Sequence, residues 1–217
     1  MHNPDSFIEE VTEEVRRDRL FAAFRKYGWI GALAVVAIVG GTAWREWTAS
    51  QAVARAEAFG DGLLEALDVG GSAERREALA AVQATGGQKA IVDLLLASDP
   101  AEDKAATLAA LDRLIADPGQ PQSLRDLATL RRVVVAGTEM PLADRQGALD
   151  GIAQPGRPFR TLAQEQLAYL QIEAGDTEGA IALLQALTVD QEASGPLRSR
   201  AAQVITALGG APATDAG

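Results

Sequence analysis

The sequence contains no cysteine and a single histidine, His2. Without cysteine there is no disulfide framework, no thiolate metal site and no thiol chemistry. Nucleophilic and acid–base catalysis depend on positioned histidine or cysteine, or on activated serine or lysine, and the only lysines after residue 47 are Lys89 and Lys104. Adjacent carboxylates such as Glu102 and Asp103 are typical of a first helical turn, where they complement the helix dipole. The sequence therefore indicates that the protein is not an enzyme and predicts neither a cofactor nor a metal site.

Aromatic residues are scarce beyond the N-terminal region, where only Phe59, Phe159 and Tyr169 follow residue 47. A core in this part must be built from alanine, leucine, valine and isoleucine, which favours thin, closely packed helices. No stretch alternates apolar and polar residues with the period of two that marks a half-buried strand. We therefore expect an all-α fold. The net charge of −10 opposes binding to phosphate backbones, so we expect no nucleic-acid partner.

One stretch, 27–44, contains no charged residue. As a helix it would be about 27 Å long, close to the ~30 Å hydrocarbon core of a bilayer. Aromatic residues mark both of its edges, as in an interfacial belt: Tyr27 and Trp29 on one side, Trp44 and Trp47 on the other. The pattern predicts a single transmembrane helix that anchors the protein in a membrane.

Two alternatives compete with this interpretation. A cleaved signal peptide would place its cleavage site near Ala52–Ala54, but its apolar region would be too long and the 26 residues before it are rich in acidic groups. A buried core helix is the second alternative, although few core helices are apolar on all faces over this length.

Basic residues flank the span unequally. Five precede it and only Arg45 and Arg55 follow it closely, which predicts a cytoplasmic N-terminus and an exported C-terminal domain. The five that precede it are Arg16, Arg17, Arg19, Arg25 and Lys26.

Small residues recur within the span at a spacing of four. Gly28 and Ala32 form one such pair, Ala37 and Gly41 another, and Gly40 adds a further notch. This spacing lets helices approach closely in lipid, and it predicts a helix-packing face, although small residues are also common in membrane spans generally.

Four segments follow from these patterns: a cytoplasmic amphipathic segment (1–26), the transmembrane helix (27–44), a periplasmic helical domain (45–208) and a disordered tail (209–217). In the first segment, Ser6 and Glu9 form a capping-box pattern at the start of a short helix. Within the domain, apolar periodicity with glycine, proline and aspartate boundaries predicts helices at 52–67, 72–82, 89–97, 101–116, 123–136, 141–152, 159–174, 176–187 and 196–208. Ser72 and Asp99 are the predicted N-caps of two of them.

The segment 167–187 resembles one tetratricopeptide repeat, a pair of antiparallel helices. Small residues on each helix allow close approach, a glycine permits the left-handed exit from the first helix, an aspartate caps the second, and leucines fill the interior. These residues are Leu167, Ala168, Gly175, Asp176, Ala180, Leu184 and Leu187. A weaker copy at 127–130 precedes 167–170 by 40 residues, longer than the ~34 of a regular repeat. The sequence predicts an irregular α-solenoid of antiparallel helix pairs; the alternative is an ordinary helical bundle.

Over residues 7–208, the whole chain resembles the bacterial single-anchor, tetratricopeptide-like proteins of the YfgM type. The resemblance is carried by the charged N-terminal segment 7–20, the motif 124–131 and the segment 158–163 that leads into the Gly175–Asp176 turn. It implies a location in the bacterial inner membrane and a role beside the SecYEG translocon and a periplasmic chaperone or client polypeptides. The competing hypothesis is a structural accessory subunit of another inner-membrane assembly, such as a respiratory complex.

Overall fold

The computed structural model describes the backbone of residues 4–211 and the side chains of residues 25, 26 and 28–211. Within this range it contains nine α-helices, one short 3-10 helix and no strand, so the predicted all-α class is confirmed. The chain divides into two compact units, one ending at Gly60 and the other beginning at Asp61. Most of the predicted tail, residues 212–217, lies outside the described residues.

The first unit consists of one helix, α1, which spans Pro4–Asp68 and continues into the second unit. The helix predicted at 52–67 is therefore an extension of the span rather than a separate element. The capping box at Ser6 is wrong, because α1 already begins at Pro4, a residue that suits a first helical position. Every residue from 28 to 58 is exposed.

A single segment of the described chain, Gly28–Asp68, is long and apolar enough to span a membrane. None of its apolar window is buried, which contradicts the interpretation as a core helix. By length and composition, the structure therefore retains one N-terminal candidate span.

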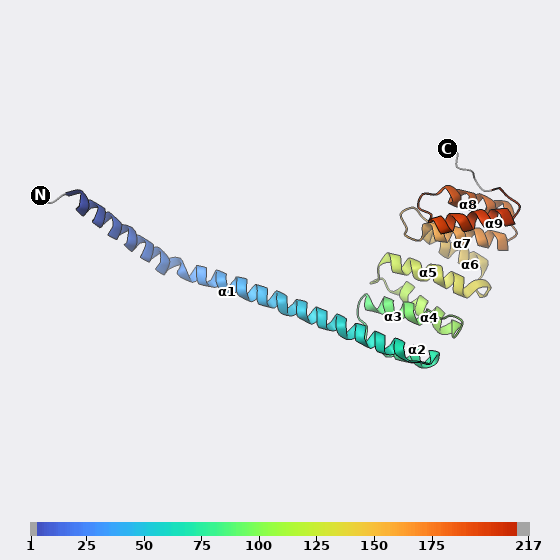
Figure 1. Cartoon of the computed structure of the whole chain (residues 1–217), viewed down its shortest axis with the longest axis horizontal. Coiled ribbons are helices and arrows are strands. Elements are labelled where there is room, and N and C mark those ends of the chain that lie inside the picture. Colours follow the sequence, from blue (N-terminus) through green and yellow to red (C-terminus); the bar gives the residue numbers. More distant parts are fainter. Residues whose placement is uncertain (1–3, 212–217) are drawn as a thin grey trace. The chain divides into compact units, whose positions relative to one another are not determined.

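In the second unit, each helix packs mainly against its neighbours in the chain, and the labels can be followed in order in Figure 1. The elements after α1 are α2 (Ser72–Ala81), α3 (Gln88–Leu96), α4 (Lys104–Ala116), α5 (Gln122–Ala136), the 3-10 helix η1 (Gly137–Glu139), α6 (Leu142–Ile152), α7 (Arg160–Glu173), α8 (Thr177–Val189) and α9 (Gly195–Ala207).

Two predicted helix starts are wrong. The helix α4 begins at Lys104 rather than after Asp99, because the carboxylate of Asp103 caps it by accepting a hydrogen bond from the Ala106 backbone N–H at 2.9 Å. Asp99 instead holds the preceding turn, accepting from the Glu102 N–H. The N-cap of α2 is Gly71, not Ser72, and it makes no side-chain capping bond.

Successive helices form the pairs α3–α4, α5–α6 and α7–α8. The second helix of each pair buries three residues at matching positions, the second lying four residues after the first and the third lying three residues after the second. The matched sets are Thr107, Leu111 and Leu114 on α4; Arg145, Leu149 and Ile152 on α6; and Ala180, Leu184 and Leu187 on α8. The sets are 38 residues apart from α4 to α6 and 35 from α6 to α8. Both spacings are shorter than the 40 residues between 127–130 and 167–170. They differ from each other because α4 continues for nine residues after Thr107 whereas α6 continues for seven after Arg145, and because α5 is one residue longer than α7.

The core is divided into three clusters that share helices. One lies among α3, α4 and α5, the next among α5, α6 and α7, and the last among α7, α8 and α9. Because α5 and α7 each contribute to two clusters, the apolar interior continues from one helix pair to the next.

Candidate interaction surfaces

The candidate span offers exposed aromatic and small residues. Trp29, Trp44 and Trp47 are each more than half exposed, and the rings of Trp44 and Trp47 lie 5.5 Å apart, centroid to centroid. A Cβ built on Gly28, Gly40 or Gly41 would meet nothing within 4 Å, and Ala32 and Ala37 are also exposed. The predicted helix-packing positions are therefore open on the surface of α1 itself.

The repeat-packing residues lie in two clusters rather than one. Ala168, Leu184 and Leu187 are buried together at the contact of α7, α8 and α9, and Ala180 is fully buried on α8. Leu167 is only partly buried and packs against the preceding cluster instead.

The turn between α7 and α8 has the backbone that its sequence requires. Gly175 has φ +81°, in the left-handed region that favours glycine. The Asp176 carboxylate accepts from the Gly179 N–H at 2.9 Å and so caps α8.

A buried carboxylate joins α7 to α9. Glu165 is 3% exposed, and its two oxygens accept hydrogen bonds from Arg200 Nε at 3.0 Å and Nη2 at 2.8 Å. The Tyr169 hydroxyl donates to Glu165 Oε1 at 3.0 Å. Burial, and then the neighbouring carboxylate, raise the pKa of Tyr169. The pairing is charge-assisted and bidentate, which fixes the register of the two helices.

A second buried carboxylate lies one helix pair earlier. Asp126 on α5 is 1% exposed, and its Oδ1 accepts from Gln122 Nε2 at 2.8 Å and from Arg157 Nη2 at 2.6 Å. Arg157 belongs to the loop before α7, so this ion pair links α5 to the loop that leads into α7. Asp126 Oδ2 and Arg157 Nε are both buried without a hydrogen-bond partner.

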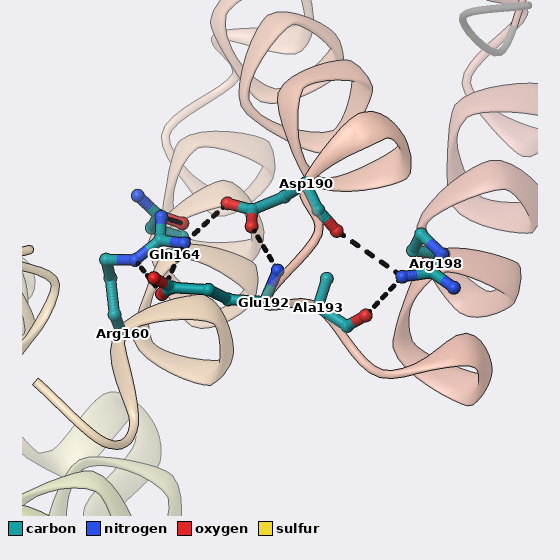
Figure 2. Close-up of polar contacts among 6 residues, drawn as sticks. All are labelled: Arg160, Gln164, Asp190, Glu192, Ala193 and Arg198. Atoms are coloured by element: carbon teal, nitrogen blue, oxygen red, sulfur yellow. Dashed lines mark hydrogen bonds and ion pairs between the residues drawn. The ribbon is translucent and has the colours of Figure 1, made fainter. Parts of the chain in front are cut away.

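The start of α7 is tied to the α8–α9 connection by a further cluster. Figure 2 shows Arg160 reaching Asp190 and Glu192, at 2.7 and 2.8 Å, while Arg198 turns toward backbone carbonyls of the same connection. Burial tends to raise the pKa of Asp190, but the hydrogen bonds from Arg160 and the Glu192 backbone outweigh it, and the pKa lies below its ordinary value.

Arg145 stands where the other second helices bury Thr107 and Ala180. It is 5% exposed, donates from Nε to the Met140 carbonyl at 2.9 Å and forms a bidentate pair with Glu173. That pair lowers the pKa of Glu173 and raises the pKa of Arg145.

These polar ties were missed by sequence reasoning. The signal that could have found them is a charged residue inside an otherwise apolar helical stripe, as at Asp126, Arg145 and Glu165. Their partners lie 31, 28 and 35 residues away in the sequence, at Arg157, Glu173 and Arg200 respectively.

A hollow of about 220 Å³ opens where α6, α7 and α8 meet. Leucine side chains contribute from all three helices, and polar groups come from α6 and α7. Its lining includes Leu142, Gln146, Asp150, Leu167, Leu170 and Leu183.

The part of the chain that the structure describes holds no group of three histidine or carboxylate side chains placed to share a metal ion. In comparisons with known proteins, the chain matches no protein-family model, no curated protein and no solved structure.

Proposed function

We infer that this protein is a membrane-anchored interaction module, in which one N-terminal span holds a tetratricopeptide-like α-solenoid at the membrane surface. The observation that carries the proposal is the matched register of buried residues on α4, α6 and α8, together with the exposed, apolar run from residue 28. Stacked helix pairs present extended surfaces suited to polypeptides, and a tether keeps such a surface near membrane-bound partners.

The proposed setting is the bacterial inner membrane, with the N-terminus in the cytoplasm and the helical domain in the periplasm. There the protein would serve protein export, beside a SecYEG-like translocon and a periplasmic chaperone or emerging client chains. The unequal count of basic residues around the span supports the orientation, and the resemblance over residues 7–208 supports the partner.

Affinity purification of the tagged full chain from membranes, in mild detergent, tests the partner. Stoichiometric recovery of the secretion machinery is the expected result. Recovery of an energy-transducing complex instead would favour the competing role as a structural accessory subunit and would contradict the proposed one.

A further inference from the structure

The hollow among α6, α7 and α8 has a counterpart one helix pair earlier that is spanned by charged side chains. There, Asp112 on α4 forms an ion pair with Arg132 on α5. Lys104, the first residue of α4, donates to the Ala136 carbonyl at 3.1 Å and pairs with Glu139 at 2.7 Å. Internal side chains therefore provide the basic groups at that contact.

At the contact among α6, α7 and α8, a carboxylate occupies the matching position but basic side chains do not. The 38-residue register that matches α4 to α6 places Asp150 at the position of Asp112 and Leu142 at the position of Lys104. The residue of α7 that matches Arg132 is Leu170 if the terminal glycines Gly137 and Gly175 are aligned. It is Ile172 if the 40-residue spacing is used.

Both choices are apolar, so α7 supplies no cation to Asp150. Among the described residues, the Asp150 carboxylate forms no ion pair. The side chain of Gln154 donates a hydrogen bond to the backbone carbonyl of Asp150 and not to its carboxylate. The same differences leave a hollow of about 220 Å³ beside the exposed Asp150. Its lining combines four leucine side chains with Gln146, Asp150, Gln171 and Ala174.

We propose that this hollow binds an arginine side chain of a partner polypeptide, which supplies in trans the cation that Arg132 supplies internally to Asp112. The guanidinium pairs with Asp150, and the aliphatic stem lies on Leu142 and Leu170, as long basic side chains do on apolar surfaces. The occupant is an arginine flanked by apolar residues, a chemistry found in unfolded chains. The inference rests on the proposed function as an interaction module and specifies one of its docking points.

The test uses the full chain in detergent micelles and three dye-labelled peptides with blocked ends, which differ only at the centre of Leu-Arg-Leu, Leu-Gln-Leu and Leu-Glu-Leu. Fluorescence anisotropy gives each Kd, and protein-free micelles correct for partitioning. The arginine peptide is expected to bind about three- to fivefold more tightly than the glutamine peptide, the range of a partly exposed ion pair. About 1 M salt should remove the difference.

Asp150→Asn should abolish the preference for arginine. Asp144→Asn makes the same charge change on an exposed residue of α6 that does not line the hollow, and it should keep the preference. Gln146→Lys places an amine one turn from Asp150 and should also abolish the preference, while thermal unfolding shows that the fold is intact.

Equal affinities for the three peptides, or a preference for arginine that survives Asp150→Asn, would overturn the proposal. If a second copy of this chain fills the hollow, Asp150→Asn would lower the molar mass in sedimentation without changing peptide binding, and this too would overturn it. Co-purification of membrane partners is a separate measurement, so failure of this site and failure of the proposed function are distinguishable.

Discussion

Glu165 and Arg200, 35 residues apart in the sequence, form a bidentate ion pair between α7 and α9. The carboxylate is almost fully buried, whereas the arginine side chain is about half exposed. Removal of the arginine therefore strands a buried negative charge, while removal of the carboxylate leaves a cation that water can reach.

Arg200→Ala should lower the free energy of unfolding by about 1–2 kcal/mol. This is less than the cost of breaking a fully buried pair, because the arginine is half exposed. The matched control is Arg132→Ala, which breaks the more exposed pair with Asp112 and should cost less than about 1 kcal/mol. Urea unfolding should be followed by circular dichroism, because all three tryptophans lie on α1 and would not report on this domain. Equal costs would contradict this account.

Ala180→Leu should destabilise the α7–α8 contact by about 1–3 kcal/mol, because a larger side chain overpacks a position that is fully buried. Ala182→Leu, on the exposed face of the same helix, is the control and should change stability by no more than about 0.5 kcal/mol. An unchanged melting temperature for Ala180→Leu would show that Ala180 does not lie at a close contact between α7 and α8.

The pair between Arg145 and Glu173 should stabilise the fold above the ordinary glutamate pKa of 4.5 and lose its effect in acid. The pKa of Glu173 is lowered in the folded state by the hydrogen bonds from Arg145. A depressed carboxyl pKa contributes stability that is lost as the pH falls through the folded-state value.

Glu173→Gln should therefore melt below the wild type at pH 6, and the two melting temperatures should converge as the pH falls below 4.5. A difference that stays constant across this range would show that the glutamate charge does not stabilise the fold.

The chain has no native cysteine, so single cysteines can report topology without background. Cysteine at Ser199, an exposed residue of α9, should react with an impermeant thiol reagent in spheroplasts. Cysteine at Ser6 should react only after lysis. The reverse pattern would place the helical domain in the cytoplasm.

The small residues of the span should matter for partner recovery rather than for insertion. Helices associate in lipid through close packing, so Ala37→Leu with Gly41→Leu should leave the protein in the membrane but reduce recovery of its partner complex. Val35→Leu with Val39→Leu enlarges another pair at the same spacing and should leave recovery unchanged. If the variant with Ala37→Leu and Gly41→Leu recovers as much of the partner complex as the wild type does, the partner contact lies elsewhere in the chain.

The sequence by itself determined the features that depend on local chemistry. An uncharged run of membrane length needs no distant partner to be recognised, and it became the candidate span. Most helix ends followed from short-range groups, such as Gly175 and Asp176 between α7 and α8. At Asp99 the predicted helix start was wrong, because both Asp99 and Asp103 can cap a first turn and the structure uses Asp103.

Only the tertiary structure decided which polar groups meet. The partners of Asp126 and Glu165 lie 31 and 35 residues away, and the spacing between the matched sets of buried residues changes from 38 to 35 residues. A change of one residue in spacing rotates a helical position by about 100°, and a change of three residues moves it by nearly one turn, about 4.5 Å along the axis. Sequence spacing alone therefore could not assign these pairs. The hollow beside Asp150 is likewise a difference between two helix contacts, visible only once the register of α4 and α6 is known.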